Sequence, residues 1–275
     1  AVMRWTAGLD ARGEVLGVRA RIASPGLTGV DGSDGELDPL ACDGAIDSEY
    51  RWPASRVEWR GLAMPVRVGI WRSVGHSYNA FAVEALVDEL ALAAGRDPVA
   101  MRRALLGDRS RLRAVLDRAA ERAGWGGPIA PGRARGVAAH ACFGSFVAQV
   151  AEVSIEGGRT RVHRVTCAVD CGRVINPNIV RQQIEGGIAF GLSAALHGGI
   201  DVEDGRVVQS NFSDQPILRI DEMPEVVVEI LASEAAPSGV GELAVPVIAP
   251  AVANALAALG APRLRILPMR SAVRD

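Results

Sequence analysis

The first third of the chain shows the alternation of apolar and polar residues that is typical of strands and loops. Val2–Leu9 and Glu14–Ile22 alternate on either side of the polar stretch Asp10–Gly13, and this pattern predicts a β-hairpin. Val30–Asp47 is rich in Gly and Asp and has little periodicity, which is typical of a loop. The short apolar run Val66–Arg72 predicts a further strand.

The apolar period then changes to that of a helix. Helices are predicted at Ala80–Ala94, from Asp97 to Leu106 and at Ser110–Gly124. Ser77 or Asn79 is the candidate N-cap of the first helix, because side chains of this type accept hydrogen bonds from the free amides of a first turn. The second helix begins at an Asp-Pro pair, and Pro suits the first helical position.

Strand patterns return after Gly126–Gly136, which has the composition of a linker. β-Branched alternation predicts strands at Val137–Cys142, Val147–Ile155 and Thr160–Asp170. The last two are joined by Glu156–Arg159, whose Gly-Gly pair is a strong hairpin signal.

The last hundred residues mix both patterns. A helix is predicted to begin at Asn176-Pro177 and, after an interruption at Gly186-Gly187, to continue to Leu196. The remaining predicted elements are a hairpin, a strand, an irregular loop, a helix and a final strand, at Val202–Val207, Glu225–Ala232, Ser233–Glu242, Ala249–Leu259 and Arg263–Leu267. Because strands and helices mix without regular β-α-β alternation, the sequence predicts an α+β fold with mixed sheets and packed helices.

Composition narrows the possible functions. The 275 residues are 49% apolar and 23% charged, with 30 basic and 32 acidic residues, so the net charge is −2. This near-neutral balance does not indicate binding to nucleic acid or to an anionic membrane surface. The chain has no Lys, which excludes Schiff-base chemistry on a protein amine and a P-loop lysine. No apolar run reaches the ~18 residues of a membrane span, and the first residues do not form a signal peptide, so the compartment stays open. The four cysteines form no CxxC motif and are interpreted as small buried apolar residues.

The motif Gly239-Val-Gly-Glu242 could carry chemistry. Two glycines spaced by one residue allow positive φ and a close backbone approach to a ligand, and a carboxylate beside such a loop can act as a general base. The structural alternative is a turn in which Glu242 stabilises the following helix by ~0.3–1 kcal/mol through its N-terminal dipole. No GxGxxG pattern accompanies the motif, so a dinucleotide-binding turn is not supported.

Two further motifs are ambiguous in the same way. Gln183 lies one helical turn before Gly186-Gly187, a doublet that permits close approach by another helix or by a cofactor, and its amide can both donate and accept hydrogen bonds. Trp71–His76 follows a predicted strand end, where backbone amides could bind an anion or an oxo group. The structural alternatives are helix packing for the doublet, a satisfied turn histidine for His76, and a solvated or paired guanidinium for Arg72.

Ordered motifs run from about residue 60 to the C-terminus, at Arg72–Gly75, Asn79–Leu90, Ala94–Arg102, Asp170–Pro177, Gln183–Gly187, Phe190–Leu192, Gly239–Glu242 and Ile248–Leu256. As a set, they resemble the molybdopterin-binding large subunit of the xanthine dehydrogenase and aldehyde oxidase family. Within the family, the resemblance is greatest to the branch of the isoquinoline 1-oxidoreductase β subunit. It implies the C-terminal portion of the molybdenum-cofactor-binding domains, with a partial first subdomain over residues 1–127. A second subdomain over residues 128–275 would carry the catalytic glutamate.

The family hydroxylates an electron-poor carbon of an aldehyde or an N-heterocycle with oxygen from water. By resemblance, Glu242 is the base that takes the proton of the attacking oxygen. Val74 flanks the substrate, where Val cannot stack on a planar ring. No residue of this chain is expected to ligate the metal directly. The cofactor-binding positions carried over in this way are Gln183, Arg72, Ser73, Gly75, Gly239 and Gly241.

The resemblance also implies a cofactor and partners. The cofactor would be molybdopterin with molybdenum, in the cytosine dinucleotide form. Electrons would leave through a small subunit with [2Fe-2S] clusters, because this chain has no cysteine set for them, and then reach a cytochrome or another acceptor. Relatives carry a Gly-Gln-Gly cofactor motif in their amino-terminal part, and this motif is absent here. The chain is therefore interpreted as a fragment or as one product of a split large subunit, with a second chain completing the molybdopterin site.

One departure concerns the catalytic loop. Pro commonly follows the catalytic glutamate in the family, whereas Leu243 follows Glu242 here, which predicts a less stiff loop. The alternative function is a non-catalytic paralogue or an assembly subunit of such a complex. The presence of Glu242 favours the enzyme. A stand-alone NAD-dependent dehydrogenase is disfavoured, because its glycine fingerprint is absent from this sequence.

Overall fold

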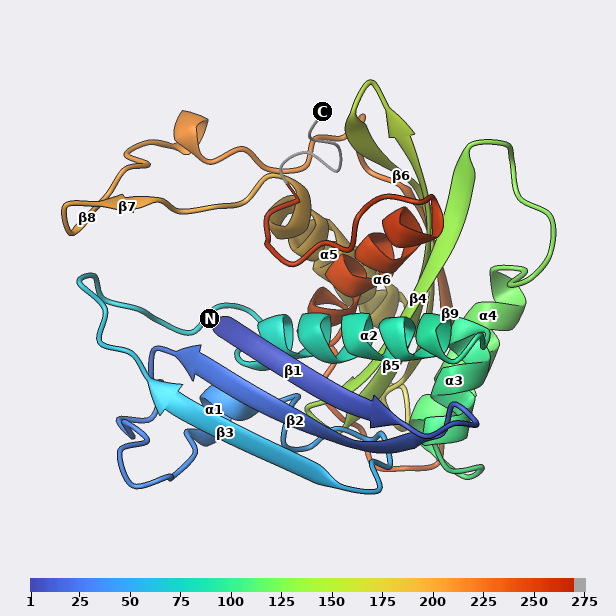
Figure 1. Ribbon diagram of the computed structural model, residues 1–275. Helices are drawn as coiled ribbons and strands as arrows, with labels where there is room; N and C mark the ends of the chain where they lie inside the picture. Colours follow the sequence, from blue (N-terminus) through green and yellow to red (C-terminus); the bar gives the residue numbers. More distant parts are fainter. Residues whose placement is uncertain (270–275) are drawn as a thin grey trace.

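The computed structural model describes residues 1–269, in which helices pack on two main sheets (Figure 1). In the first sheet, β1 is antiparallel to β2 and β3 is parallel to β2. In the second sheet, β4, β5 and β6 are antiparallel in sequence order, and β9 joins β6 in parallel. The strands are β1 (Val2–Leu9), β2 (Val15–Ser24), β3 (Ser55–Gly61), β4 (Arg133–Cys142), β5 (Ser145–Glu156), β6 (Arg159–Asp170), the small pair β7 (Val202–Glu203) and β8 (Arg206–Val207), and β9 (Glu225–Ile230).

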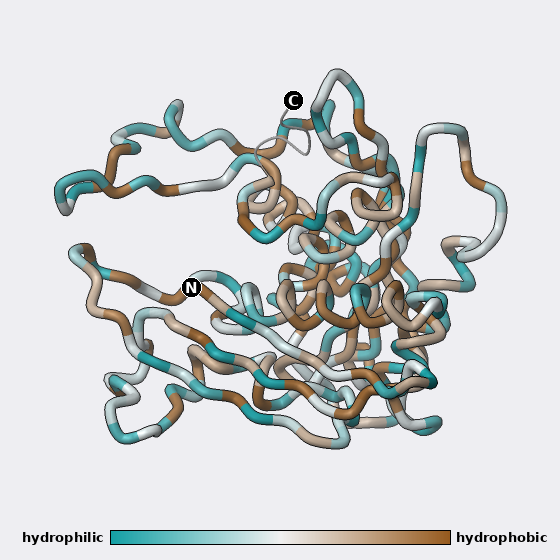
Figure 2. Tube along the Cα trace, in the orientation of Figure 1, coloured by the Kyte–Doolittle hydropathy of each residue, from teal (hydrophilic) through white to brown (hydrophobic). Residues whose placement is uncertain are grey.

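Helices cover both faces of the second sheet. They are α1 (Pro39–Cys42), α2 (His76–Ala93), α3 (Pro98–Leu105), α4 (Arg111–Arg122), α5 (Pro177–Leu196) and α6 (Val245–Ala258). The central strand β5 is buried along most of its length, because its two faces enter different cores. Val147 and Ala151 pack in the core that contains α5 and α6, whereas Ala148 and Val150 pack in the core that contains α2, α3 and α4. Apolar residues accordingly gather in this part of the molecule (Figure 2).

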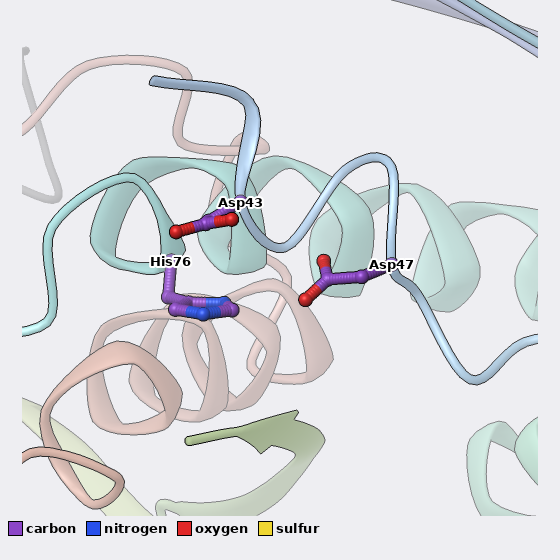
Figure 3. A group of neighbouring side chains, drawn as sticks. All are labelled: Asp43, Asp47 and His76. Atoms are coloured by element: carbon purple, nitrogen blue, oxygen red, sulfur yellow. The ribbon is translucent and has the colours of Figure 1, made fainter. Parts of the chain in front are cut away.

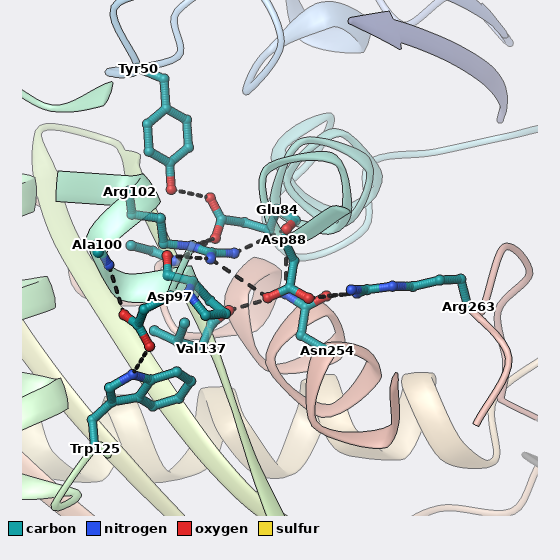
Figure 4. A network of polar contacts seen from close by, with 12 residues as sticks. Tyr50, Glu84, Asp88, Asp97, Ala100, Arg102, Trp125, Val137, Asn254 and Arg263 are labelled. Carbon is teal, nitrogen blue, oxygen red and sulfur yellow. Dashed lines mark hydrogen bonds and ion pairs between the residues drawn. The ribbon is translucent and has the colours of Figure 1, made fainter. Parts of the chain in front are cut away.

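Helix α2 is fixed by a buried polar network centred on Glu84 (Figure 4). The Glu84 carboxylate accepts hydrogen bonds from Tyr50 Oη at 2.6 Å, from Arg102 Nε at 2.9 Å and from the Ala139 amide at 2.9 Å. The Asn254 amide of α6 donates to the Glu84 carbonyl at 3.3 Å. Buried polar groups need such partners, so this network joins α2 to α3, β4 and α6 in one arrangement.

Most predicted elements are confirmed. The structure contains the first hairpin, the helices that follow Asp97 and Ser110, the three long strands with their Glu156–Arg159 turn, the small hairpin near Val202 and the strand at Glu225. The first helix begins earlier than predicted, at His76, and neither Ser77 nor Asn79 is its N-cap.

Two predicted strands are absent from the described chain. Val66–Arg72 is irregular and pairs with no strand, and its apolar side chains Val68 and Ile70 are 46% and 67% exposed. Arg263–Leu267 is irregular as well. An apolar run forms a strand only where a neighbouring strand satisfies its backbone, and neither run has one. Segments 62–72 and 198–224 instead extend from one side of the molecule (Figure 1).

The predicted linker Gly126–Gly136 is partly wrong, because β4 already begins at Arg133. A Cβ at Gly136 would lie 2.1 Å from the Ala255 amide nitrogen, so this glycine lets β4 touch the backbone of α6. Helix α6 begins at Val245 rather than Ala249. The sequence pattern also missed β3, which joins β2 across a long connection.

The predicted interruption at Gly186-Gly187 is also wrong, because α5 is continuous from Pro177 to Leu196. The doublet plays two different roles. A Cβ at Gly187 would lie 2.9 Å from the Ala244 Cβ, whereas a Cβ at Gly186 would meet nothing within 4 Å. Gly187 therefore serves close packing against the α6 end, while Gly186 faces open space.

Gly191 also packs against α6, and a matched pair of alanine substitutions tests this contact between α5 and α6. A Cβ at Gly191 would lie 2.5 Å from Ile248 Cγ2 and 3.0 Å from the Val245 carbonyl oxygen, so we expect Gly191→Ala to destabilise the protein by about 1–3 kcal/mol through overpacking. Gly186→Ala adds a methyl group to a free helix surface and is expected to stabilise by about 0.5–1 kcal/mol. Urea unfolding of both variants gives the two signs. Equal effects would contradict the packing role of Gly191.

Candidate active site

Two loops that are far apart in the sequence meet beside the first half of α5. The Ser73 amide donates a hydrogen bond to Glu242 Oε1 at 2.8 Å. Arg72 Nε donates to the Gly241 carbonyl at 2.6 Å, and a second guanidinium nitrogen contacts the same oxygen. These contacts hold the Glu242 side chain and the backbone before it against the loop that precedes α2.

Gln183 completes this group from α5. Its Oε1 accepts a hydrogen bond from Arg72 Nη2 at 3.3 Å, and a Cβ at Gly241 would lie 4.0 Å from the same oxygen. Because Oε1 is used in this contact, the amide nitrogen of Gln183 is left as a donor for a ligand. The structure thus brings together Arg72, Ser73, Gln183, Gly241 and Glu242, all of which the sequence singled out.

The loop before α2 has unusual backbone geometry. Ser73 and Val74 have φ angles of 77° and 49°, values that cost about 1–3 kcal/mol for residues other than Gly and that concentrate at functional sites. The Ser73 hydroxyl contacts the Arg72 carbonyl and lies 2.9 Å from the Ser77 hydroxyl, which also donates to the Arg72 carbonyl at 3.2 Å. Neither Gly239 nor Gly241 uses the positive φ that glycine allows.

Gly75 and Gly239 have packing roles. A Cβ at Gly75 would lie 2.2 Å from the Leu40 carbonyl oxygen, and one at Gly239 would lie 3.2 Å from the Phe143 Cβ. Gly75 therefore allows the start of α2 to touch the backbone of α1, and Gly239 fits against the β4–β5 turn. Their contact with a cofactor stays a prediction.

Burial and hydrogen bonds hold the loop that carries Glu242. Leu243, the residue that replaces the usual Pro, is fully buried, and the Gln149 amide donates to the Ala244 carbonyl at 3.0 Å. On the other side of the loop, the Ser238 amide donates to the Cys171 carbonyl at 2.9 Å. Anchored on both sides in this way, the loop is stiffened by packing instead of by a Pro ring.

An ion pair stabilises the end of β6, next to the Cys171 carbonyl that holds the Glu242 loop. Arg111 Nε donates to Asp170 Oδ2 at 2.7 Å, and its Nη2 lies 2.5 Å from Oδ1. Burial alone would raise the pKa of Asp170, but hydrogen bonds from Arg111 and the Gly172 amide lower it below its usual value. A carboxylate with a lowered pKa stabilises the fold above the unfolded pKa near 4, and this contribution is lost as pH falls through the folded value.

We therefore expect Arg111→Gln to reduce the free energy of unfolding at pH 7 by about 2 kcal/mol, the scale of charged hydrogen bonds. The difference between the variant and the wild type is expected to shrink as pH falls below 4 and to disappear only below the lowered folded pKa of Asp170, where the carboxylate is protonated in the folded protein as well. Urea unfolding at pH 7 and near pH 2 measures both effects. Arg109→Gln, a change of an exposed neighbour, is the control. A constant difference at the two pH values would contradict the role of Asp170.

Sequence reasoning missed an aromatic pair beside the site. The rings of Trp71 and Phe190 lie 4.9 Å apart, and the Arg72 guanidinium lies 5.5 Å over the Phe190 ring. The pair lines a cavity of about 530 Å³. Val74, which is half-buried, lines a smaller cavity of about 160 Å³ that also touches Trp71. Phe190 belongs to one of the ordered sequence motifs, but only the fold brings it next to Trp71.

A buried pair of histidines, one of them three residues after Ser73, lies at the start of α2. His76 Nδ1 is 3.0 Å from His140 Nε2, so one ring nitrogen of His76 has a partner. Burial lowers the pKa of His140 to about 3 and also lowers the pKa of His76, so both rings are neutral near pH 7. The four cysteines are buried and free, as interpreted from the sequence.

The donor set suits an anionic, oxygen-rich cofactor. Arg72 presents a guanidinium, Gln183 presents a free amide nitrogen, and the side of α5 at Gly186 is open. Guanidinium and amide donors bind oxo and phosphate oxygens. The residues present therefore fit the cofactor that the sequence resemblance implies.

Comparisons with known proteins give the class. Two family models, each described as a molybdopterin cofactor-binding domain, match residues 1–106 and 117–224. The chain is 38% identical over 229 residues to the isoquinoline 1-oxidoreductase subunit beta of Brevundimonas diminuta, a match that covers 82% of this chain. The chain belongs to the molybdopterin-binding subunits of the xanthine dehydrogenase family.

A second curated relative and a solved structure also match the chain. The chain is 31% identical over 307 residues to a membrane-bound aldehyde dehydrogenase (pyrroloquinoline-quinone) of Gluconacetobacter polyoxogenes. In fold, it resembles quinoline 2-oxidoreductase from Pseudomonas putida 86, with a TM-score of 0.77 at 14% identity over 97% of this chain and 60% of that one. The chain spans 29% and 39% of the lengths of the two curated relatives. No helix among residues 1–269 has the length and apolarity to cross a membrane.

Proposed function

We propose that this chain forms part of the catalytic large subunit of a molybdenum hydroxylase, with Glu242 as the general base. The substrate class is an aldehyde or an N-heterocycle, and the oxygen comes from water. The observation that carries the proposal is the hydrogen bond from the Ser73 amide to Glu242 Oε1, together with the Arg72 contacts to Gly241 and Gln183. Three separate motifs supply one carboxylate and a set of donors in a single place.

Glu242 is arranged to accept a proton. Oε1 is held by the Ser73 amide, and among residues 1–269 no hydrogen-bond donor contacts Oε2. One oxygen therefore fixes the orientation of the carboxylate while the other remains available. A general base placed in this way typically contributes 10²–10⁴-fold to the rate. Burial of Leu243 limits the movement of the loop and keeps the base in place.

Arg72 and Gln183 would hold the cofactor through the guanidinium and the free amide nitrogen, with Ser73 and the glycines shaping the backbone around it. Molybdopterin, when bound, supplies a molybdenum centre that accepts two electrons and delivers a water-derived oxygen to the substrate carbon. Val74 borders the adjoining cavity and is the proposed substrate-flanking residue. The cytosine dinucleotide form of the cofactor remains part of this proposal.

The proposal includes partners. The rest of the molybdopterin site would come from a further portion of the large subunit, either a second chain or more of the same polypeptide, since the chain spans 29% of the length of the isoquinoline 1-oxidoreductase subunit beta. Electrons would pass to a small [2Fe-2S] subunit and onward to a cytochrome or another acceptor. Within this chain, we propose residues 1–127 and 128–275 as the two molybdopterin-binding subdomains.

The test is reduction of an electron-accepting dye by the molybdenum-loaded complex, with an aldehyde or a quinoline-type heterocycle as donor. Glu242→Gln is expected to slow turnover by about 10²–10⁴-fold while leaving the molybdenum content unchanged. A complex that assembles with wild-type partner binding but contains no molybdenum would instead support the alternative, a non-catalytic paralogue or assembly subunit.

A further inference from the structure

The loop after α1 and the start of α2 bring together three groups that can ligate a metal. One ligand atom from each of Asp43, Asp47 and His76 lies within 4.8 Å of the other two (Figure 3). His76 is only 3% exposed, Asp43 is half-buried and Asp47 is exposed. We propose that these three residues bind one divalent transition-metal ion, Zn²⁺ or Mn²⁺, with water completing its coordination.

These groups have few other partners within residues 1–269. Within this described part of the chain, the Asp43 carboxylate accepts no hydrogen bond, and neither Asp43 nor Asp47 pairs with an arginine. The histidine ion pairs of the described chain belong to His163 and His197, so His76 forms none with the two carboxylates. Two carboxylates that lie together without a cation repel each other, and an ion between them removes this repulsion.

One imidazole nitrogen of His76 has a partner, and the other is the proposed ligand. His76 Nδ1 is engaged by His140 Nε2 at 3.0 Å, which leaves Nε2 of the buried ring as its free nitrogen. Metal-ligating histidines usually bind an outer partner through their second nitrogen, and this partner fixes the ring. Asp47 is also oriented, because its Oδ1 accepts a hydrogen bond from the Gly44 amide at 2.6 Å.

The donor set selects the class of ion. One imidazole nitrogen suits Zn²⁺ and other transition ions, while carboxylate oxygens suit harder ions such as Mn²⁺. An all-oxygen site of the kind that Ca²⁺ and Mg²⁺ prefer is not formed here. The site ties the α1 loop to a point three residues after Ser73, so a bound ion would fix the loop whose amide holds Glu242.

Calorimetric titration of untagged, EDTA-treated protein with ZnCl₂ and MnCl₂ tests this site. We expect one ion per chain, a rise in melting temperature with the ion, and at least tenfold weaker affinity in Asp43→Asn and in Asp47→Asn. Asp204→Asn, a change of an exposed Asp in the β7–β8 turn, should bind as the wild type does. Because Asp47 is exposed, its variant is expected to fold even if a change at His76 does not.

The absence of saturable binding, or equal affinity in Asp43→Asn, Asp47→Asn and Asp204→Asn, would overturn the proposal. Preference for Ca²⁺ or Mg²⁺ over both transition ions would overturn the assigned class. The titration needs neither molybdopterin nor a partner chain. Its failure is therefore distinct from failure of the proposed hydroxylase function.

Discussion

Glu242→Gln in the molybdenum-loaded complex is expected to lower kcat/KM by about 10²–10⁴-fold, the usual contribution of a general base. The amide has nearly the same shape as the carboxylate, and it can still accept the hydrogen bond from the Ser73 amide through its oxygen. The substitution therefore removes the proton acceptor while keeping the loop contacts. Steady-state dye reduction, with molybdenum measured per complex, separates lost chemistry from lost cofactor.

Glu234→Gln is the matched control, because Glu234 lies in the same irregular loop and its side chain is fully exposed. It is expected to keep wild-type rates and molybdenum content. A Glu242→Gln complex that turns over within a few-fold of wild type, with full molybdenum content, would remove Glu242 from the chemistry. The assignment to the family would stand in that case, since it rests on the sequence matches.

The residues of the site were predictable, but the geometry was not. The order of Arg72, Gln183 and Glu242 along the chain pointed to one family, yet no local pattern shows that their loops meet. The backbone strain also occurs at residues that the sequence did not indicate. Two glycines stand in the Glu242 loop, but positive φ occurs at Ser73 and Val74, where contacts from α1, α2 and the Glu242 loop override local preference.

The fold errors have a similar origin. Periodicity located the long strands and helices because each buries a regular face. It failed at Val66–Arg72, whose apolar residues have no strand beside them, and at Gly187, where loss of helix propensity is offset by contact with Ala244. Asp43 and Asp47 lay in a stretch without periodicity, so nothing in the sequence linked them to His76. Tertiary packing decides all of these cases.

Arg102→Met is expected to produce the largest loss of stability, about 3–5 kcal/mol, because it leaves the buried carboxylate of Glu84 without its cation. Both side chains are 0% exposed, and Arg102 Nε lies 2.9 Å from Glu84 Oε2. Arg102 also donates to the Pro98 and Glu84 carbonyls at 3.1 and 3.0 Å. Met replaces the aliphatic part of Arg, so the loss reports mainly the missing guanidinium charge and its hydrogen bonds.

Arg103→Met is the control, since the next residue pairs with Asp117 on the surface with both side chains more than 40% exposed. Exposed pairs contribute 0 to about 1 kcal/mol, so this variant should unfold close to the wild type in urea. If both variants lose the same stability, the pairing of Arg102 with Glu84 is not what fixes α2. A much larger loss of unfolding free energy in Arg102→Met than in Arg103→Met would instead mean that buried contacts in the core fix α2, the helix that follows the Ser73 loop. Arg102 would then act on the site by holding α2, about 30 residues along the chain from the Arg72 and Ser73 positions that it supports.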